Sequence, residues 1–307
     1  YAIAGLGLMV LTGFSGQVSF GQAAFVAIGA YTHTILLTRY SVPWLLSLPI
    51  AALVAGLVGL AVGRICGKMH GLYLAIATLS IAIVTERLIG GAGDFTGGHR
   101  GLSVPEINIL GLAIDASWKV YLLNFVIFVG CILIVRNLTR TRSGRAMIAI
   151  RDSEVSARAL GTNVAFFKAY AFFISAVFAG LAGGLLAHAF FYITPETFGM
   201  GESIRLLLMI VVGGIGTIHG AVFGAFFIVL LPTVLSWVKI VLPSAVATSG
   251  GFDSLAFGLI LLGFILFEPD GLYGRWTKIH HYFNVFPMYK KRSFQRQKTF
   301  LKTERLR

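Results

Sequence analysis

Glu86 and Arg87 form the only adjacent pair of opposite charges inside an apolar run of this chain (LSIAIVTERLIGG). A charge within a membrane costs about 2.5–3.5 kcal/mol on insertion scales, so a carboxylate such as Glu86 is a candidate for carrying a proton or an ion along a transport path. Adjacent residues do not face each other on a helix. Both residues also lie toward one end of their run, where long side chains reach the headgroups. Glu86 is therefore either a structural residue at the membrane surface or part of a path.

Sequence patterns for catalysis or nucleotide binding are absent: the chain contains no GxSxG, HExxH or GxxxxGK[ST]. The nearest approach, GRICGKM (63–69), has three residues between its glycines where a phosphate loop needs four. The histidines of the apolar part show no metal-ligand spacing and are interpreted as structural: His33, His70, His99, His188 and His219. We therefore expect no enzymatic activity, metal site or cofactor in this chain, and the energy for any transport must come from an ion gradient or from another polypeptide.

Two apolar stretches are interrupted by glycine and polar residues: TGFSGQVSFGQAAF (12–25) and GGIGTIHG (213–220). Interrupted helices free backbone groups that lipid cannot satisfy, and transporters place such segments at permeation paths. The alternative is a tight turn between two helices, for which glycine is equally suited. The turn is favoured for 213–220, whereas the two interpretations of 12–25 are balanced. The candidate path residues are Ser15, Gln17, Ser19, Gln22, Gly213, Gly214 and Gly216, together with Glu86.

The composition indicates a membrane protein. Hydrophobic residues make up 57% of the 307 residues, charged residues only 12%, and the mean hydropathy is +0.84; soluble domains carry about 25% charged residues. Runs long enough for a membrane-crossing helix, which needs about 20 residues, lie at 21–38, 43–63, 71–93, 117–136, 166–191, 219–235 and 252–268. Shorter apolar pieces cover 1–11 and 203–213. The predicted fold class is all-α, a polytopic transmembrane helical permease with interrupted helices.

Basic residues predict the orientation, because loops rich in Lys and Arg stay in the cytoplasm. The stretch 136–168 holds seven, the tail 269–307 holds ten, and the turn RICGK adds Arg64 and Lys68. We expect a transmembrane domain over 1–268 with a cytoplasmic loop at 137–165, followed by a basic cytoplasmic tail over 269–307. This orientation requires nine visible crossings. It also places Tyr1 near the outer face, which predicts at least one further helix upstream.

The polar loop SGRAMIAIRDSEVSARALGTN (143–163) has helical periodicity, and its apolar stripe is Met147, Ile150, Val155, Ala159 and Leu160. Asp152 is a candidate cap for a second short helix that ends at Gly161. Such a helix either lies on the membrane, which periodicity alone favours, or docks in the groove of a partner.

Seven segments in order carry a resemblance to a known family. They are TGFSGQVSFGQAAFVAIGAY (12–31), GLYLAIATL (71–79), FTGGHRGL (95–102), SGRAMIAIRDSEVSARALGTN (143–163), ITPETFG (193–199), LLMIVVGGIGTIHGAVFGAF (207–226) and EPDGLYG (268–274). Along nearly its whole length to about residue 275, the chain resembles the LivM-type permease subunit of ATP-binding-cassette importers for branched-chain amino acids. Urea-importer permeases share many of these segments, so the substrate is less closely defined than the family.

The resemblance implies a transport mechanism that depends on partners. Such permeases pair with a second, LivH-like permease, bind two cytoplasmic ATPases (LivG/LivF-like) that hold ATP and Mg²⁺, and receive substrate from a periplasmic binding protein. The loop 143–163 then resembles a coupling helix seated in an ATPase cleft. Importers more broadly carry an EAA-x3-G signature there, whereas this chain has Val155, Ser156 and Ala157 in the EAA positions. The residues expected to couple to the ATPases are Arg145, Arg151, Asp152, Glu154 and Gly161.

The predicted function is an importer permease for leucine, isoleucine or valine in a bacterial inner membrane. The alternatives are a urea-importer permease, a secondary carrier with Glu86 as its ion-linked carboxylate, and a membrane scaffold. The tail beyond about 275 is basic with interspersed aromatic residues. It is interpreted as a solvated, partly disordered tail that fixes topology, with attraction to anionic lipids as the alternative and no role in binding nucleic acid.

Overall fold

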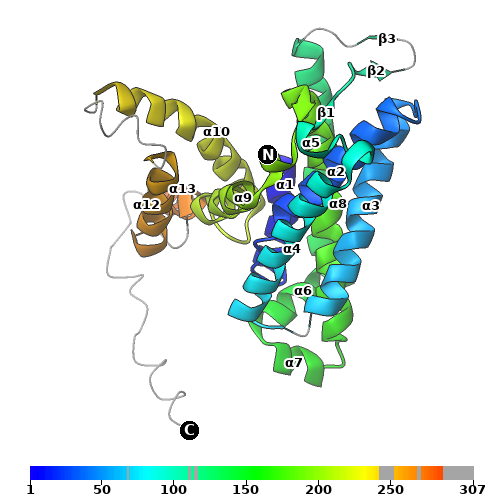
Figure 1. Cartoon of the computed structure of the whole chain (residues 1–307). Helices are drawn as coiled ribbons and strands as arrows, with labels where there is room; N and C mark the ends of the chain where they lie inside the picture. The colour runs from blue at the N-terminus through cyan, green and yellow to red at the C-terminus, as the bar shows by residue number, and fades with distance from the viewer. Residues whose placement is uncertain (68, 110–111, 114–116, 242–251, 268–270, 286–307) are drawn as a thin grey trace.

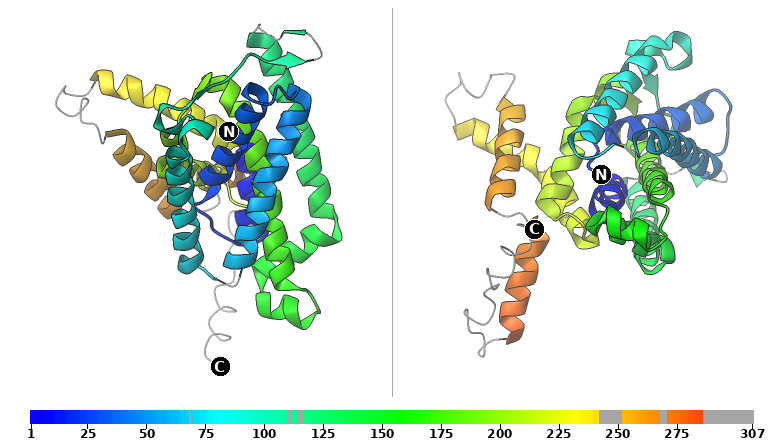
Figure 2. Two further views of the ribbon diagram at one scale, coloured as in Figure 1. Left: turned by 45° about the vertical axis from the view of Figure 1, so that its right-hand side comes forward. Right: turned by 90° about the horizontal axis from the view of Figure 1, so that it is seen from below.

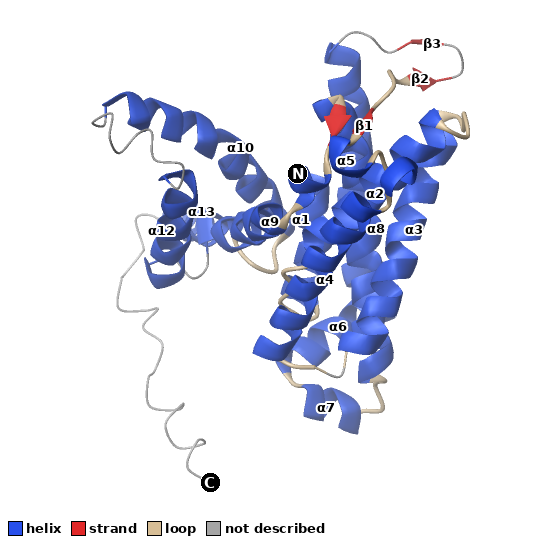
Figure 3. Ribbon diagram, viewed as in Figure 1, coloured by secondary structure: helices blue, strands red, loops and turns tan. Residues whose placement is uncertain are grey.

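The computed structural model describes residues 1–67, 69–109, 112–113, 117–241, 252–267 and 271–285, and its helices dominate the described chain (Figures 1 and 3). Each predicted apolar segment forms a helix. The apolar helices are α1 (Ala2–Leu8), α2 (Gln22–Thr38), α3 (Trp44–Cys66), α4 (Leu72–Gly91), α5 (Ser117–Arg140), α8 (Val164–Phe190), α9 (Met200–Gly213), α10 (Ile218–Val241) and α12 (Phe252–Phe267). The all-α fold class is confirmed. Lys68 of the RICGK turn lies outside the described residues.

Five helices of the described residues are long and apolar enough to cross a membrane: α3, α4, α5, α8 and α10. The first apolar segment is shorter, because it consists of α1 followed by the π-helix η1 (Met9–Phe14). Helices α9 and α12 have 14 and 16 residues. The chain is therefore a multi-pass membrane protein in which several apolar helices are too short to span the hydrocarbon alone. The number of crossings remains a prediction.

Helix α8 lies at the centre of the bundle, packed against α2 and α3 (Figures 1 and 2). Small residues allow this approach, since a Cβ added to Gly180 would lie 2.5 Å from the Cβ of Ala55, and one added to Gly63 would lie 2.7 Å from the Cβ of Phe172. Where water supplies no drive for helix association, such close backbone contact provides the packing energy. The small-residue faces of α3 and α8 therefore pack within one chain.

Short strands join two distant segments at one end of the bundle, the end opposite α6 and α7 (Figure 1). Strand β1 (Leu102–Ser103) pairs antiparallel with β4 (Tyr192–Ile193), and β2 (Asn108–Ile109) pairs with β3 (Leu112–Ala113). Three single-turn 3-10 helices lie in the same loops: η2 (Gly93–Phe95), η3 (Gly98–Arg100) and η4 (Pro195–Phe198). The β1–β4 pair, which helical periodicity does not predict, holds the loop after α4 against the loop after α8.

The other end of the bundle carries two short polar helices, α6 (Arg142–Asp152) and α7 (Glu154–Ala159), within the predicted loop 137–165. Beside the bundle lie α9, α10, α12 and the helix α13 (Gly271–Val285), as seen from below in Figure 2. Residues 271–285 of the basic tail are helical, and the expected partial disorder of the tail stays a prediction. Tyr273 of α13 stacks on His219, with ring centroids 5.2 Å apart. Residues 286–307 lie outside the described part of the chain.

Candidate functional site

The interrupted stretch 12–25 is an unwound segment inside the protein. The π-helix η1 ends at Phe14, residues 15–21 are not helical, and α2 begins at Gln22. Its backbone groups find partners in the interior: the N–H of Phe20 donates to Thr78 Oγ1 (3.0 Å), and the N–H of Ala23 donates to Ser203 Oγ (3.2 Å). A π-turn followed by unwound backbone is typical of functional sites in membrane helices. The interpretation as a broken helix fits this segment.

The polar side chains of the unwound segment are buried, since Ser15, Gln17, Ser19 and Gln22 are all 0–3% exposed. Gln22 Nε2 lies 3.4 Å from the carbonyl oxygen of Ser175 and Gln22 Oε1 accepts from Ser175 Oγ (3.1 Å). Gln17 Nε2 donates to Ser15 Oγ (2.6 Å), but Gln17 Oε1 has no hydrogen-bond partner among the described residues. A buried acceptor without a partner is rare in a folded chain. This unpartnered oxygen distinguishes Gln17 from Ser15 and Gln22, which are also predicted path residues.

The second interrupted stretch is a tight turn, as the sequence favours. Helix α9 ends at Gly213, α10 begins at Ile218, and Gly214 and Gly216 have φ values of 120° and 83°. Non-glycine residues rarely adopt such backbone angles. The turn lies against η1, because a Cβ added to Gly13 would lie 2.6 Å from the Cα of Gly216. The two glycine-rich stretches therefore meet in space at Gly13 and Gly216, which are 203 positions apart in the chain.

The predicted coupling segment (143–163) consists of most of α6 together with α7, which are separated by a break at Ser153. Ser153 caps α7, with its Oγ accepting from the N–H of Ser156 (3.2 Å), whereas Asp152 is the last residue of α6. The prediction of Asp152 as the cap is therefore wrong by one residue, because the chain leaves helical geometry one position later. Gly161 has φ 82°, and the N–H groups of Gly161 and Thr162 donate to the carbonyls of Arg158 and Ala157. This pattern is a Schellman motif, so the predicted stop at Gly161 is confirmed.

Arg151 links α6 to the unwound segment. Its Nη1 donates to the carbonyl oxygen of Gly13 (2.9 Å), and a Cβ added to Gly16 would lie 3.0 Å from Arg151 Cγ. The same guanidinium forms an ion pair with Asp152 (2.9 Å), whose side chain is 63% exposed. Arg151 thus fills the space between the coupling segment and the start of the unwound segment.

Glu154 links α7 to α8. Its Oε1 forms an ion pair with Nζ of Lys168, which is 2% exposed, and its Oε2 lies 2.9 Å from His70 Nε2. Burial opposes ionisation of Glu154, but hydrogen bonds and charges from Lys168 and His70 outweigh it and lower the pKa of the carboxyl below its ordinary value of 4.5. The carbonyl oxygen of Lys168 lies 3.4 Å from Gln17 Nε2. Glu154 therefore connects through one residue to the unwound segment.

The apolar stripe expected along the coupling segment divides at the break. Met147 and Ile150 of α6 are 0% and 2% exposed, whereas Val155 and Leu160 at α7 are 81% and 84% exposed. The break at Ser153 changes the phase of the helix, so Ala157 is the buried residue of α7 and Ala159 is exposed. Arg145 of α6 is also exposed. The single continuous stripe is a wrong prediction, and α7 presents apolar side chains outward.

Residues 1–267 match the family described as "Branched-chain amino acid transport system / permease component". The chain belongs to this family. It is 34% identical over 254 residues to the "High-affinity branched-chain amino acid transport system permease protein LivM" of Escherichia coli, an overlap of 75% of this chain and 60% of that relative. It is 25% identical over 295 residues to LivH of Salmonella typhimurium, covering 90% of this chain and 91% of the relative.

The chain is also 29% identical over 231 residues to the "Autoinducer 2 import system permease protein LsrC" of an Enterobacter species, an overlap of 72% of this chain and 64% of that relative. The chain spans 60% of the length of the LivM relative. No solved structure matches it. The LivM-type resemblance seen in the sequence is confirmed at the level of the family.

Glu86 in this permease-family chain lies apart from the other predicted path residues. It is half-buried in α4, and a Cβ added to Gly199 at the start of α9 would lie 3.0 Å from Glu86 Oε2. Arg87 beside it is exposed. Glu86 therefore sits at the end of the bundle that carries η4, whereas the unwound segment begins at the opposite end against α6.

Two histidines that appear scattered in the sequence form one buried network. His33 Nε2 and His188 Nε2 lie 2.9 Å apart, and His188 Nε2 also accepts from Trp44 Nε1 (2.9 Å). Ser47 Oγ lies 3.0 Å from His33 Nδ1. The network joins α2, α3 and α8, and nothing in the spacing of these residues predicts it. The pairing of Lys168 has a clearer signal in the sequence, because a lone lysine near the start of an apolar run indicates a charged partner.

Proposed function

We propose that this chain is a membrane-spanning permease subunit of an ATP-driven importer for branched-chain amino acids. It forms half of the translocation path together with a second, LivH-like permease in a bacterial inner membrane. Its α6–α7 end and its tail face the cytoplasm. ATP and Mg²⁺ are bound by two partner ATPases, and a periplasmic protein delivers leucine, isoleucine or valine. The family match and the names of the LivM and LivH relatives support this assignment.

One observation carries the coupling part of the proposal: two predicted coupling residues, Arg151 and Glu154, are linked to the interrupted stretch 12–25 that holds predicted path residues. Arg151 holds the carbonyl oxygen of Gly13, and Glu154 holds Lys168, whose own carbonyl oxygen lies beside Gln17. Both links run from the short polar helices to the start of the interrupted stretch, at Gly13 and Gln17. A displacement of α6 and α7 is thereby transmitted to residues 13–17, directly through Arg151 and, from Glu154, by way of Lys168 in α8.

The exposed apolar side chains of α7 supply the contact with the ATPase. Val155 of α7 and Leu160, which follows the last residue of α7, are more than 80% exposed at the tip of the bundle. A short helix that lays apolar side chains into a hydrophobic groove is a common mode of recognition between proteins. When the ATPases close on ATP, they move α7 and the adjoining α6, so that Glu154 and Arg151 move with these helices.

The unwound segment supplies the moving part of the path. Its polar side chains hydrogen-bond the interior, and these bonds must be exchanged when the segment shifts. The free acceptor Gln17 Oε1 is available to the ammonium group of an amino acid or to water that accompanies it. Selectivity among leucine, isoleucine and valine rests with the binding protein rather than with this segment.

Reconstitution tests the proposal. The full chain, the second permease, the two ATPases and the binding protein are placed in proteoliposomes with ATP inside, and uptake of labelled leucine and urea is compared. Leucine uptake that requires ATP and the binding protein, and that survives an uncoupler, is expected. Uptake by this chain alone without ATP, abolished by the uncoupler, would establish the secondary carrier instead. Uptake of urea in place of leucine would reassign the substrate.

The docking surface is tested by replacing Val155 and Leu160 with alanine. We expect the ATPases to be lost from the purified complex while the permease stays folded, because surface substitutions change stability by only about 0.5 kcal/mol. Phe95→Ala is the matched control, since it removes a 52% exposed apolar side chain at the opposite end of the bundle. Retention of the ATPases by the double variant would refute the role of α7.

A further inference from the structure

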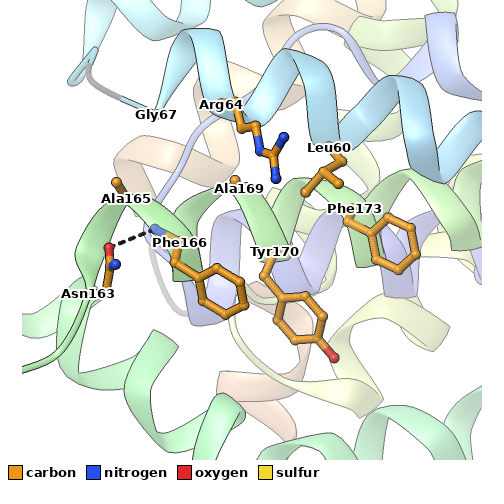
Figure 4. A pocket seen from close by; sticks show the side chains of 9 residues that line it. All are labelled: Leu60, Arg64, Gly67, Asn163, Ala165, Phe166, Ala169, Tyr170 and Phe173. Atoms are coloured by element: carbon orange, nitrogen blue, oxygen red, sulfur yellow. Dashed lines mark hydrogen bonds between the residues drawn. The ribbon is translucent and has the colours of Figure 1, made fainter.

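A cavity of about 420 Å³ opens on the side of the α3–α8 pair, near the end that carries α6 and α7. Leu60 and Arg64 of α3 form one wall, and Phe166, Tyr170 and Phe173 of α8 form the other (Figure 4). Both helices are long and apolar enough to cross a membrane. The cavity therefore lies on the flank of two spanning helices, close to where both reach one surface of the membrane.

The α8 wall is a row of aromatic rings. Phe166 and Tyr170 stack with centroids 6.1 Å apart and an interplanar angle of 6°, and Tyr170 and Phe173 stack at 6.3 Å and 13°. Figure 4 shows the three rings projecting side by side from one face of the helix. Phe166 is 59% exposed. Parallel, partly exposed rings at the surface of a membrane helix offer flat apolar sides to an extended hydrocarbon chain.

Arg64 gives the cavity a positive charge. It lies in the last turn of α3, is exposed, and makes no ion pair or side-chain hydrogen bond with any residue in the described ranges. The carboxylate of Glu154, in α7 at the same end of the bundle, is already engaged by Lys168 and His70. Figure 4 shows the guanidinium reaching from α3 across the space above the rings. An unpaired guanidinium beside an apolar groove matches a planar anion such as a phosphate.

We propose that this groove is a binding site for an anionic phospholipid of the cytoplasmic leaflet, with the phosphate on Arg64 and an acyl chain along Phe166, Tyr170 and Phe173. A second protein helix is a poorer occupant, because packing it here would bury an unpaired guanidinium. The choice of leaflet rests on the proposed orientation of the permease. The chemistry of the groove does not depend on the transported substrate.

Native mass spectrometry of the purified full chain, with phosphatidylglycerol or phosphatidylcholine added, tests the site. The wild type is expected to retain phosphatidylglycerol preferentially, and Arg64→Gln to weaken that preference about five-fold, the effect of one basic residue at a charged lipid surface. Arg136→Gln is the matched control, because Arg136 is an exposed arginine of α5 outside the groove. Phe166→Ala is expected to weaken the binding of both lipids.

Equal retention of the two lipids by the wild type, or equal losses with Arg64→Gln and Arg136→Gln, would overturn the proposal. Displacement of the lipid by millimolar inorganic phosphate would assign the charge to a free anion. Cross-linking of Leu60→Cys to the second permease in native membranes would make the groove a protein interface. Labelling of Leu160→Cys by an impermeant maleimide tests the orientation separately. Labelling from outside would refute the orientation and leave the lipid preference standing.

Discussion

The ion pair between Glu154 and Lys168 gives the sharpest test of how the coupling helix is held. Glu154→Gln leaves the ammonium of Lys168, 2% exposed, without its partner. Removing one member of a buried pair costs about 3–5 kcal/mol, and we expect about 3 kcal/mol here because Glu154 is 28% exposed. Lys168→Met leaves a partly solvated carboxylate that still contacts His70, so its cost is about 1 kcal/mol.

The double variant distinguishes a true pair from two independent effects. If the two side chains stabilise each other, Glu154→Gln with Lys168→Met costs about 1 kcal/mol, which gives a coupling energy of about 3 kcal/mol. The assay is the unfolding midpoint of the purified chain in detergent, where about 2 °C corresponds to 1 kcal/mol for a chain of this size. Glu154→Gln is therefore expected to lower the midpoint by about 6 °C, and the double variant by about 2 °C.

Asp152→Asn is the control for this cycle, since it neutralises a neighbouring carboxylate whose side chain is 63% exposed. Its effect should stay within about 0.5 kcal/mol. Additive losses in the double variant, near 8 °C, would show that Glu154 and Lys168 act separately and would refute the link between α7 and α8. A loss of coupling between ATP hydrolysis and uptake in Glu154→Gln, with assembly intact, is expected in the same preparations.

Three further outcomes are expected. The extra stability of wild type over Glu154→Gln should be fully present above about pH 4.5 and disappear as the pH falls through the lowered pKa of Glu154. A difference between the unfolding midpoints of the two proteins that is constant from pH 7 to pH 3 would contradict this expectation. Gly13→Ala should destabilise the chain by about 2 kcal/mol or more, because the new Cβ would lie 2.6 Å from the backbone of Gly216. Gly130→Ala in α5 is the control: its new Cβ would meet no atom within 4 Å, so it should be neutral or stabilising in the same unfolding assay. Gly161→Ala should destabilise the chain by about 1 kcal/mol from backbone strain alone, since φ is 82° and a new Cβ would meet no atom within 4 Å. It should also uncouple ATP hydrolysis from uptake, whereas Gly161→Asn should restore the stability and the coupling. Equal activity of the wild type and the alanine variant would refute the role of this helix stop.

The amino-acid sequence determined the class of protein and the position of its helices. Uninterrupted apolar runs indicate helices because only a helix satisfies its backbone within lipid, and each run predicted here is helical. Gly161 is predicted as a helix stop because the residue that ends a helix in a Schellman motif adopts a positive φ, which glycine does without strain. The turn at 213–220 is predicted because the basic loop at 136–168 and the basic tail lie on one side of the membrane, which requires an even number of crossings between them. These features depend on local chemistry or on the period of the chain.

Tertiary structure alone decided what the polar residues contact. The structure pairs Glu154 with Lys168 and His70, Arg151 with Gly13, and His33 with His188, and each pairing joins different elements of the fold. The same packing buries Ser15, Gln17, Ser19 and Gln22 and turns Val155 and Leu160 outward. The physical reason is that helix periodicity defines which side chains share a face, but not which neighbouring helix that face meets. That choice is made by the close backbone contacts that glycine and alanine permit between α2, α3 and α8.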